Sequence, residues 1–210
     1  NQAGYYDTNY FRVFVSSTFH LGDLWEWNSS KFNGEYGGSG KKGVGAADEI
    51  CNKLAQWAGL PGTYTSWTSS SPSSRPQDRG LATCAAAGTN SVGWFRVDGT
   101  TNIVYNWNHL TRKLFFHPSG YWVSDLPLNN PILKNEFGQD GGVGVRTGTD
   151  NFGSATSNNC EGFTYQWDSR SGSVGSAGQT NISDGNPSWS NWQDIGCGAP
   201  YNLYCFQSAP

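Results

Sequence analysis

Five cysteines constrain this chain more than any other feature of its sequence: Cys51, Cys84, Cys160, Cys197 and Cys205. None of them stands in the C-x-x-C spacing of zinc sites and thioredoxin-type redox motifs. Four of the five can form two structural disulfides, which persist in oxidising compartments. The remaining cysteine is then either a buried free thiol or an intermolecular link. We therefore expect an extracellular or cell-surface protein.

Length and charge limit the choice of fold and partner. A chain of 210 residues is long enough to bury a core. We expect residues 1–10 to be the end of a stalk or upstream segment, and residues 11–210 to form a single domain. The formal charge of −3 argues against nucleic acid and anionic membrane as partners. No apolar stretch approaches the roughly 20 residues that span a bilayer, so we expect no membrane insertion.

Residues 46–58 carry the one clear helical pattern. Ile50, Leu54 and Trp57 fall on one face at i, i+4 and i+7. Gly59 follows directly, as expected at the end of a helix. The sequence therefore predicts a helix that packs this face against a core.

Stretches rich in β-branched and aromatic residues predict strands. They cover residues 11–15, 63–68, 92–97, 102–107, 142–147 and 201–206. Asp98-Gly99 predicts a hairpin between the third and fourth of these. Residues 108–116 suggest a short helical turn, and residues 150–193, rich in Gly, Ser, Asn and Thr, suggest mostly irregular structure. We expect an α+β fold with a twisted antiparallel sheet, one or two helices and a long irregular loop region.

The order of cysteines and short motifs resembles the C-type lectin-like fold. More closely, it is similar to a bacterial extracellular branch related to endostatin-like domains. The matching stretches are residues 47–51, 58–64, 97–100, 106–111, 130–132, 146–153, 160–163 and 203–206. The resemblance implies two disulfides, Cys51–Cys205 and Cys160–Cys197, and leaves Cys84 unpaired. It also implies that ligands bind at the long loop.

Two segments depart from the family's pattern. An expanded segment between the first strand and the helix adds Trp25 and Trp27, and an insertion after Leu110-Thr111 adds Tyr121 and Trp122. Large apolar side chains on extra loops need cover, either from each other or from a partner. We therefore expect these four aromatic residues at an interface or a secondary binding surface, unless the loops pack on one another.

The long loop combines the side chains that a sugar site needs. A pyranose presents a C–H face that stacks on an aromatic ring, and hydroxyls that bond to planar polar groups. For any single tryptophan, a place in the core is an equally good expectation. The candidate ligand-binding residues are Trp167, Asp168, Arg170, Asn186, Trp189, Asn191 and Asp194.

Calcium is the weaker alternative for this loop, and we expect no cofactor and no metal. Some members of the fold hold calcium with Glu-Pro-Asn or Gln-Pro-Asp and a following Trp-Asn-Asp. This chain has Asn186-Pro187-Ser188 and Trp192-Gln193-Asp194 in their place, and the first of these lacks a carboxylate. Calcium needs about six to eight oxygen ligands, usually with several carboxylates. The alternative is that Trp192 lies in the core and Asp194 caps a turn.

The sequence favours recognition over catalysis. It contains no GxSxG, HExxH or GxxxxGK(S/T) phosphate loop, and its histidines are scattered. We expect a non-enzymatic adhesion domain of an exported bacterial fibre or surface protein, with a glycan or cell-surface ligand as partner. Fibre tips are often trimeric, so a homotrimer is expected from architecture alone. The alternative is a protein–protein or oligomerising module without a sugar site.

Overall fold

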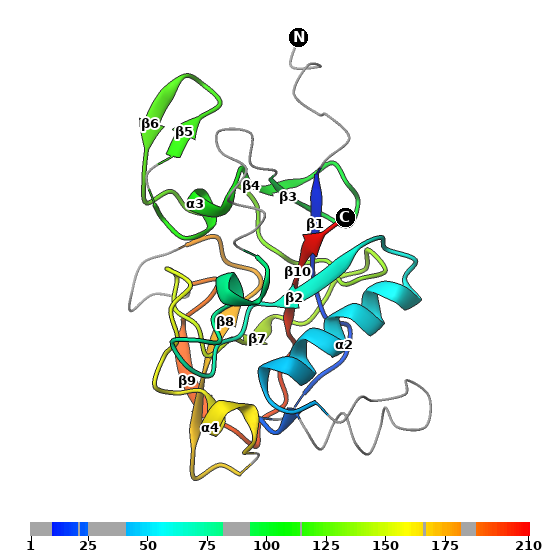
Figure 1. The fold of residues 1–210 in the computed structure, drawn as a ribbon, viewed down its shortest axis with the longest axis vertical. Helices are drawn as coiled ribbons and strands as arrows, with labels where there is room; N and C mark the ends of the chain where they lie inside the picture. The colour runs from blue at the N-terminus through cyan, green and yellow to red at the C-terminus, as the bar shows by residue number, and fades with distance from the viewer. Residues whose placement is uncertain are drawn as a thin grey trace.

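A five-stranded sheet lies at the centre of the fold (Figure 1), in the strand order β2-β10-β1-β3-β4. The computed structural model describes residues 10–20, 22–24, 41–81, 93–113, 115–165, 167–181 and 188–210. The central strands are β1 Phe11–Val15, β2 Thr63–Ser66, β3 Trp94–Arg96, β4 Asn102–Val104 and β10 Tyr204–Ala209. The other strands are β5 Phe115–His117, β6 Tyr121–Val123, β7 Gly144–Arg146, β8 Ser171–Ser176 and β9 Gln193–Gly196. The helices are α2 Val44–Trp57, α3 Trp107–Leu110 and α4 Cys160–Phe163, with a 3-10 turn at Pro76–Arg79.

The architecture is α+β with open sheets and few helices, as expected, but one detail of the prediction was wrong. The central sheet is mixed, because β1 runs antiparallel to β10 and parallel to β3. The described part of residues 150–193 is mostly irregular, as expected, but strand β8 within it pairs with β7 and β9 in a second sheet. The small residues of β8 hide its strand character and allow close packing. A Cβ on Gly175 would collide with the carbonyl oxygen of Trp189.

Strand alternation gives the central sheet two buried faces. On β1, Phe14 packs with the helix-side core, whereas Val13 and Val15 join the opposite core. On β10, Cys205 and Phe206 point to these two cores in the same way. The sheet is therefore buried from both sides.

Helix α2 covers one face of the sheet and begins two residues earlier than predicted. Ile50 and Leu54 are buried as expected, but Trp57 is 42% exposed, which corrects its assignment to the core face. Small alanines complete the packed side instead, and they are Ala46, Ala47 and Ala55. Gly59 adopts a left-handed backbone with φ of 68°, which suits glycine after a helix end.

The hairpin predicted around Asp98-Gly99 is present, and it joins β3 to β4. The carboxylate of Asp98 accepts hydrogen bonds from the backbone N–H groups of Thr100 and Thr101. The helical turn predicted over residues 108–116 is shorter and earlier. It ends at Leu110, and residues 115–117 form strand β5.

Two disulfides fasten this framework, and they join the pairs that the resemblance implies. Cys51–Cys205 ties α2 to β10, and Cys160–Cys197 ties α4 to the end of β9. Both are consistent with an extracellular protein. Cys84 lies outside the described residues. None of the helices in the described ranges has the length and apolarity that crossing a bilayer requires.

The core opposite α2 is built around Trp67. Its ring centroid lies 5.0 Å from that of Trp189 and 5.5 Å from that of Phe206. Its indole Nε1 donates a 2.7 Å hydrogen bond to Oγ of Ser190. Trp67 therefore connects the central sheet to the segment that precedes β9.

Trp67→Phe should lower the free energy of unfolding by about 2–3 kcal/mol, because it removes packed volume and the buried bond to Ser190. Trp57→Phe is the matched control and should change it by less than about 0.5 kcal/mol, since Trp57 is partly exposed. Urea titrations followed by circular dichroism compare the two. Equal losses would contradict this description of the core.

His20 makes stability depend on pH. Burial lowers the pKa of this fully enclosed imidazole from 6.5 to about 3. Its Nε2 lies 3.1 Å from Oγ1 of Thr18. Below pH 6.5 the imidazole of His20 is protonated in the unfolded chain but stays neutral in the folded protein. The free energy of unfolding therefore falls as pH falls, and this loss levels off near pH 3.

Urea titrations between pH 7 and pH 4 should show this effect as a difference between proteins. Wild type should lose up to about 1.4 kcal/mol per pH unit more than His20→Gln, which cannot titrate. The carboxylates titrate in both proteins and cancel in the comparison. Parallel pH profiles would mean that His20 is protonated in the folded state.

Candidate functional site

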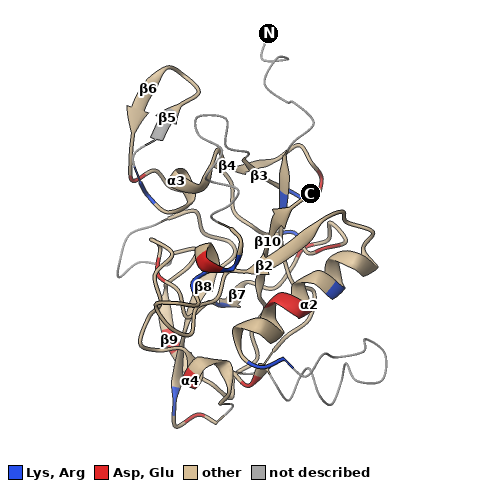
Figure 2. Ribbon diagram, viewed as in Figure 1, with Lys and Arg blue, Asp and Glu red and all other residues tan. Residues whose placement is uncertain are grey.

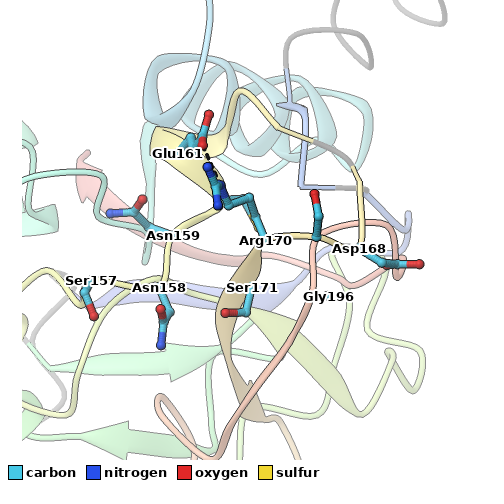
Figure 3. A pocket seen from close by; sticks show the side chains of 10 residues that line it. Ser157, Asn158, Asn159, Glu161, Asp168, Arg170, Ser171 and Gly196 are labelled. Atoms are coloured by element: carbon cyan, nitrogen blue, oxygen red, sulfur yellow. Dashed lines mark hydrogen bonds and ion pairs between the residues drawn. The ribbon is translucent and has the colours of Figure 1, made fainter.

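An open polar hollow of about 520 Å³ lies between α4 and the β8–β9 edge (Figure 3). Its walls come from three chain segments that are brought together by the second sheet and the Cys160–Cys197 disulfide. The lining residues are Ser157, Asn158, Asn159, Cys160, Glu161, Asp168, Ser169, Arg170, Ser171 and Gly196.

One wall is a turn of left-handed backbone. All four residues of α4 have positive φ: 52° at Cys160, 52° at Glu161, 74° at Gly162 and 62° at Phe163. Asn159 holds the turn, because its Oδ1 accepts a hydrogen bond from the N–H of Gly162. Left-handed backbone costs roughly 1–2 kcal/mol for each residue with a Cβ. This segment therefore stores strain where it meets the hollow.

The strained turn presents Glu161 to Arg170. Arg170 Nε donates a 2.7 Å bond to Oε1 of Glu161, and Figure 3 shows the two side chains directed at each other. This contact raises the pKa of Arg170. The side chains are 60% and 50% exposed for Arg170 and Glu161, and exposed pairs contribute little to stability. The pair does not offset the backbone strain, and such strain clusters at functional sites.

Two further carboxylates lie at this site. Asp168 lines the hollow, and its Oδ1 accepts a bond from the N–H of Gly198. Asp194 accepts a 2.6 Å bond from Nδ2 of Asn158 and a 2.9 Å bond from Oγ of Ser173. These bonds fix one oxygen of Asp168 and both oxygens of Asp194.

A buried cation supports the floor. The Arg146 guanidinium is fully buried and donates to Sγ of Cys160 at 3.1 Å and to the carbonyl of Ala199 at 2.8 Å. Burial lowers its pKa to about 10, which still leaves it charged at neutral pH. It also lies over the ring of Tyr201, 5.2 Å from the centroid. Arg146 therefore links β7 to the disulfide beneath the hollow.

The structure gathers some predicted site residues and separates others. Asp168 and Arg170 line the hollow, and Trp167, next to Asp168 in the chain, is 65% exposed. Asp194 joins them through Asn158. Asn186 lies outside the described residues.

Trp189 is a correction. It is fully buried against Trp67 and Tyr204, so its ring belongs to the core and not to a ligand site. Asn191 is half-buried in the same segment and is not among the residues that line the hollow. The alternative that placed Trp192 in the core was also wrong, because Trp192 is 40% exposed. Asp194 bridges residues of neighbouring segments and does not cap a turn.

Sequence reasoning missed Glu161 as a lining residue, and it missed short polar residues such as Asn158 and Ser171. Asn158 and Ser171 lie in a Ser- and Asn-rich stretch, where nothing distinguishes them from their neighbours. The one signal was position: Asn158 lies just before Cys160, whose disulfide pins the turn.

The remaining predicted residues lie elsewhere. Tyr121 and Trp122 are exposed on β6, in a hairpin that extends from the body (Figure 1). Trp25 and Trp27 lie outside the described residues. Within the described ranges, no three His, Cys, Asp or Glu residues lie close enough to hold a metal ion.

Charged residues are spread thinly over the described chain, and Figure 2 shows no run of Lys and Arg along one face of it. Comparison with models of protein families gave no match, and a search of curated proteins gave none either. The function therefore has to be argued from the site itself.

Gly172 on β8 provides a direct test of how Arg146 packs against the Cys160–Cys197 disulfide. A Cβ there would lie 2.5 Å from Nη1 of Arg146 and 2.7 Å from Sγ of Cys160. Gly172→Ala should therefore cost about 1–3 kcal/mol of unfolding free energy. Gly178→Ala is the control, because its Cβ would meet only Leu133, at 3.8 Å. Urea titrations measure both, and a silent Gly172→Ala would contradict the packing of Arg146 against the disulfide.

Proposed function

We propose that this protein is a non-enzymatic recognition domain and that the polar hollow binds glycans. The observation that carries the proposal is the joint presentation of carboxylate, guanidinium, amide and hydroxyl groups in one open hollow, together with the exposure of Trp167, which precedes the lining residue Asp168 in the chain. Sugars need this mixture, because they combine an apolar C–H face with several hydroxyls.

The hollow has hydrogen-bonding capacity to spare. Glu161 uses only Oε1 toward Arg170, and Arg170 uses only Nε in return. The hydroxyl of Ser171 makes no hydrogen bond to other residues of the described chain. These groups offer donors and acceptors to hydroxyls of a ligand, while Trp167 offers a stacking surface.

The wider setting is part of the proposal. We infer a C-type lectin-like fold of the endostatin-related bacterial branch and an exported surface or fibre protein as its parent. The disulfide from helix to last strand and the second disulfide at the base of the long region support this assignment. They also favour an extracellular or cell-surface location.

The positions of the histidines agree with a binding site that carries out no reaction. His20 and His109 are buried, and His109 Nε2 lies 2.8 Å from the carbonyl of Pro127, a structural contact. His117 stacks on Tyr121 in the hairpin. No histidine is among the lining residues of the hollow. We therefore propose recognition and not catalysis, and we propose that it needs no cofactor.

One observation favours a second candidate, a protein–protein or oligomerising module. The β5–β6 hairpin pairs with no other described strand and exposes Tyr121 and Trp122. Exposed aromatic residues are enriched at protein interfaces. Light scattering discriminates the two: a stable trimer that Trp122→Ala dissociates would favour the module, whereas a monomer favours the glycan site.

Trp167→Ala should weaken glycan binding about tenfold or more, because it removes the exposed ring that we propose as the stacking surface. Trp57→Ala, which removes an exposed tryptophan from α2, should leave binding unchanged. A glycan array read with and without EDTA finds the ligand, and calorimetry then compares the variants. Absence of binding to every glycan under both conditions would overturn the proposal, and loss of binding in EDTA would show that calcium is required.

A further inference from the structure

We propose that the hollow binds uncharged sugar residues and disfavours those that carry a carboxylate. The Glu161–Arg170 pair then forms hydrogen bonds with two neighbouring hydroxyls of the sugar. This inference rests on the proposed glycan function and names the ligand class of the same site. It is argued from the charges around the hollow and from the donor and acceptor atoms that the Glu161–Arg170 pair leaves free.

Carboxylates outnumber cations around the hollow. Glu161 and Asp168 line it, and Asp194 lies at its edge through the bond from Asn158. Arg170 is the one Lys or Arg among the lining residues. A sugar carboxylate placed here would meet like charges at short range, which disfavours it against a neutral analogue.

The buried Arg146 does not reverse this balance. Its Nη1 donates to Cys160 Sγ, and its Nη2 donates to the carbonyls of Gly196 and Ala199. The side chain is fully buried, so it offers no donor to a ligand. With its charge included, three carboxylates still face two guanidinium groups.

The one exposed guanidinium is already engaged by a carboxylate. Arg170 Nε bonds to Glu161, which leaves its two terminal nitrogens as donors and Oε2 of Glu161 as an acceptor. A sugar with adjacent hydroxyls can accept from Arg170 with one oxygen and donate to Glu161 with the next. A sugar carboxylate cannot donate to Glu161 and would compete with it for Arg170.

The left-handed backbone explains why Glu161 is placed there. A carboxylate on a strained turn keeps its position without the ion pair, because Asn159 and the Cys160–Cys197 disulfide hold the turn from both sides. The pair is therefore preorganised and needs little reordering when a ligand arrives.

The experiment uses the whole domain and matched probes: oligosaccharides that end in a neutral hexose and the same oligosaccharides that end in the corresponding uronic acid. At low salt, the neutral probe should bind about tenfold or more tightly than its acidic counterpart. Asp168→Asn should narrow this gap and keep the bond from Gly198, because an amide retains Oδ1. Asp140→Asn, an exposed carboxylate paired with Lys134 elsewhere, should leave the gap unchanged.

Glu161→Gln tests whether the Glu161 carboxylate accepts a hydrogen bond from a sugar hydroxyl. It keeps the size of the side chain and should weaken binding of the neutral probe about tenfold, with the melting temperature unchanged. A probe that lacks one hydroxyl of the terminal hexose should bind wild type and Glu161→Gln equally. Equal or tighter binding of uronic acids, or full binding by Glu161→Gln, would overturn the inference and leave glycan binding intact. Failure of every probe to bind would remove the proposed function itself.

Discussion

The disulfide between Cys160 and Cys197 is the contact on which the geometry of the hollow depends. It joins the left-handed turn of α4 to the end of β9, across 37 residues of sequence. Arg146 reaches the same sulfur from β7, so three distant segments meet at one buried point. A polar site with few apolar contacts of its own gains its shape from this cross-link, since such a link restricts the alternatives open to the chain.

The central sheet anchors this point to the rest of the protein. The N–H of Arg146 donates to the carbonyl of Asn202, and Val145 forms a bridge with Asn202 just before β10 begins. Strand β10 is buried on both faces and is tied to α2 by the other disulfide. The position of Glu161 therefore depends on a continuous path from the core to the rim of the hollow, which suits a rigid recognition surface.

Local patterns in the sequence were sufficient for the framework and insufficient for the site. The 3.6-residue period of α2 and the apolar residues of β1 act within a few residues, so both elements were predictable. Strand β8 was not, because its Ser and Gly residues have low strand preference and pair only once β7 and β9 are in place. Trp189 looked like a ligand residue because burial depends on Trp67 and Tyr204, which are distant in sequence. The left-handed turn gave no signal, since a non-glycine residue takes that conformation only where surrounding contacts enforce it.

We propose that the hollow, and not the β5–β6 hairpin, meets the ligand. Nitrogen-15 NMR of the labelled domain, titrated with the best-binding glycan, locates contacts residue by residue. We expect the shifts to concentrate in residues 157–161, 167–171 and 194–196, with the indole of Trp167 among the largest. Shifts that gather on residues 115–123 instead, with the hollow unchanged, would contradict it.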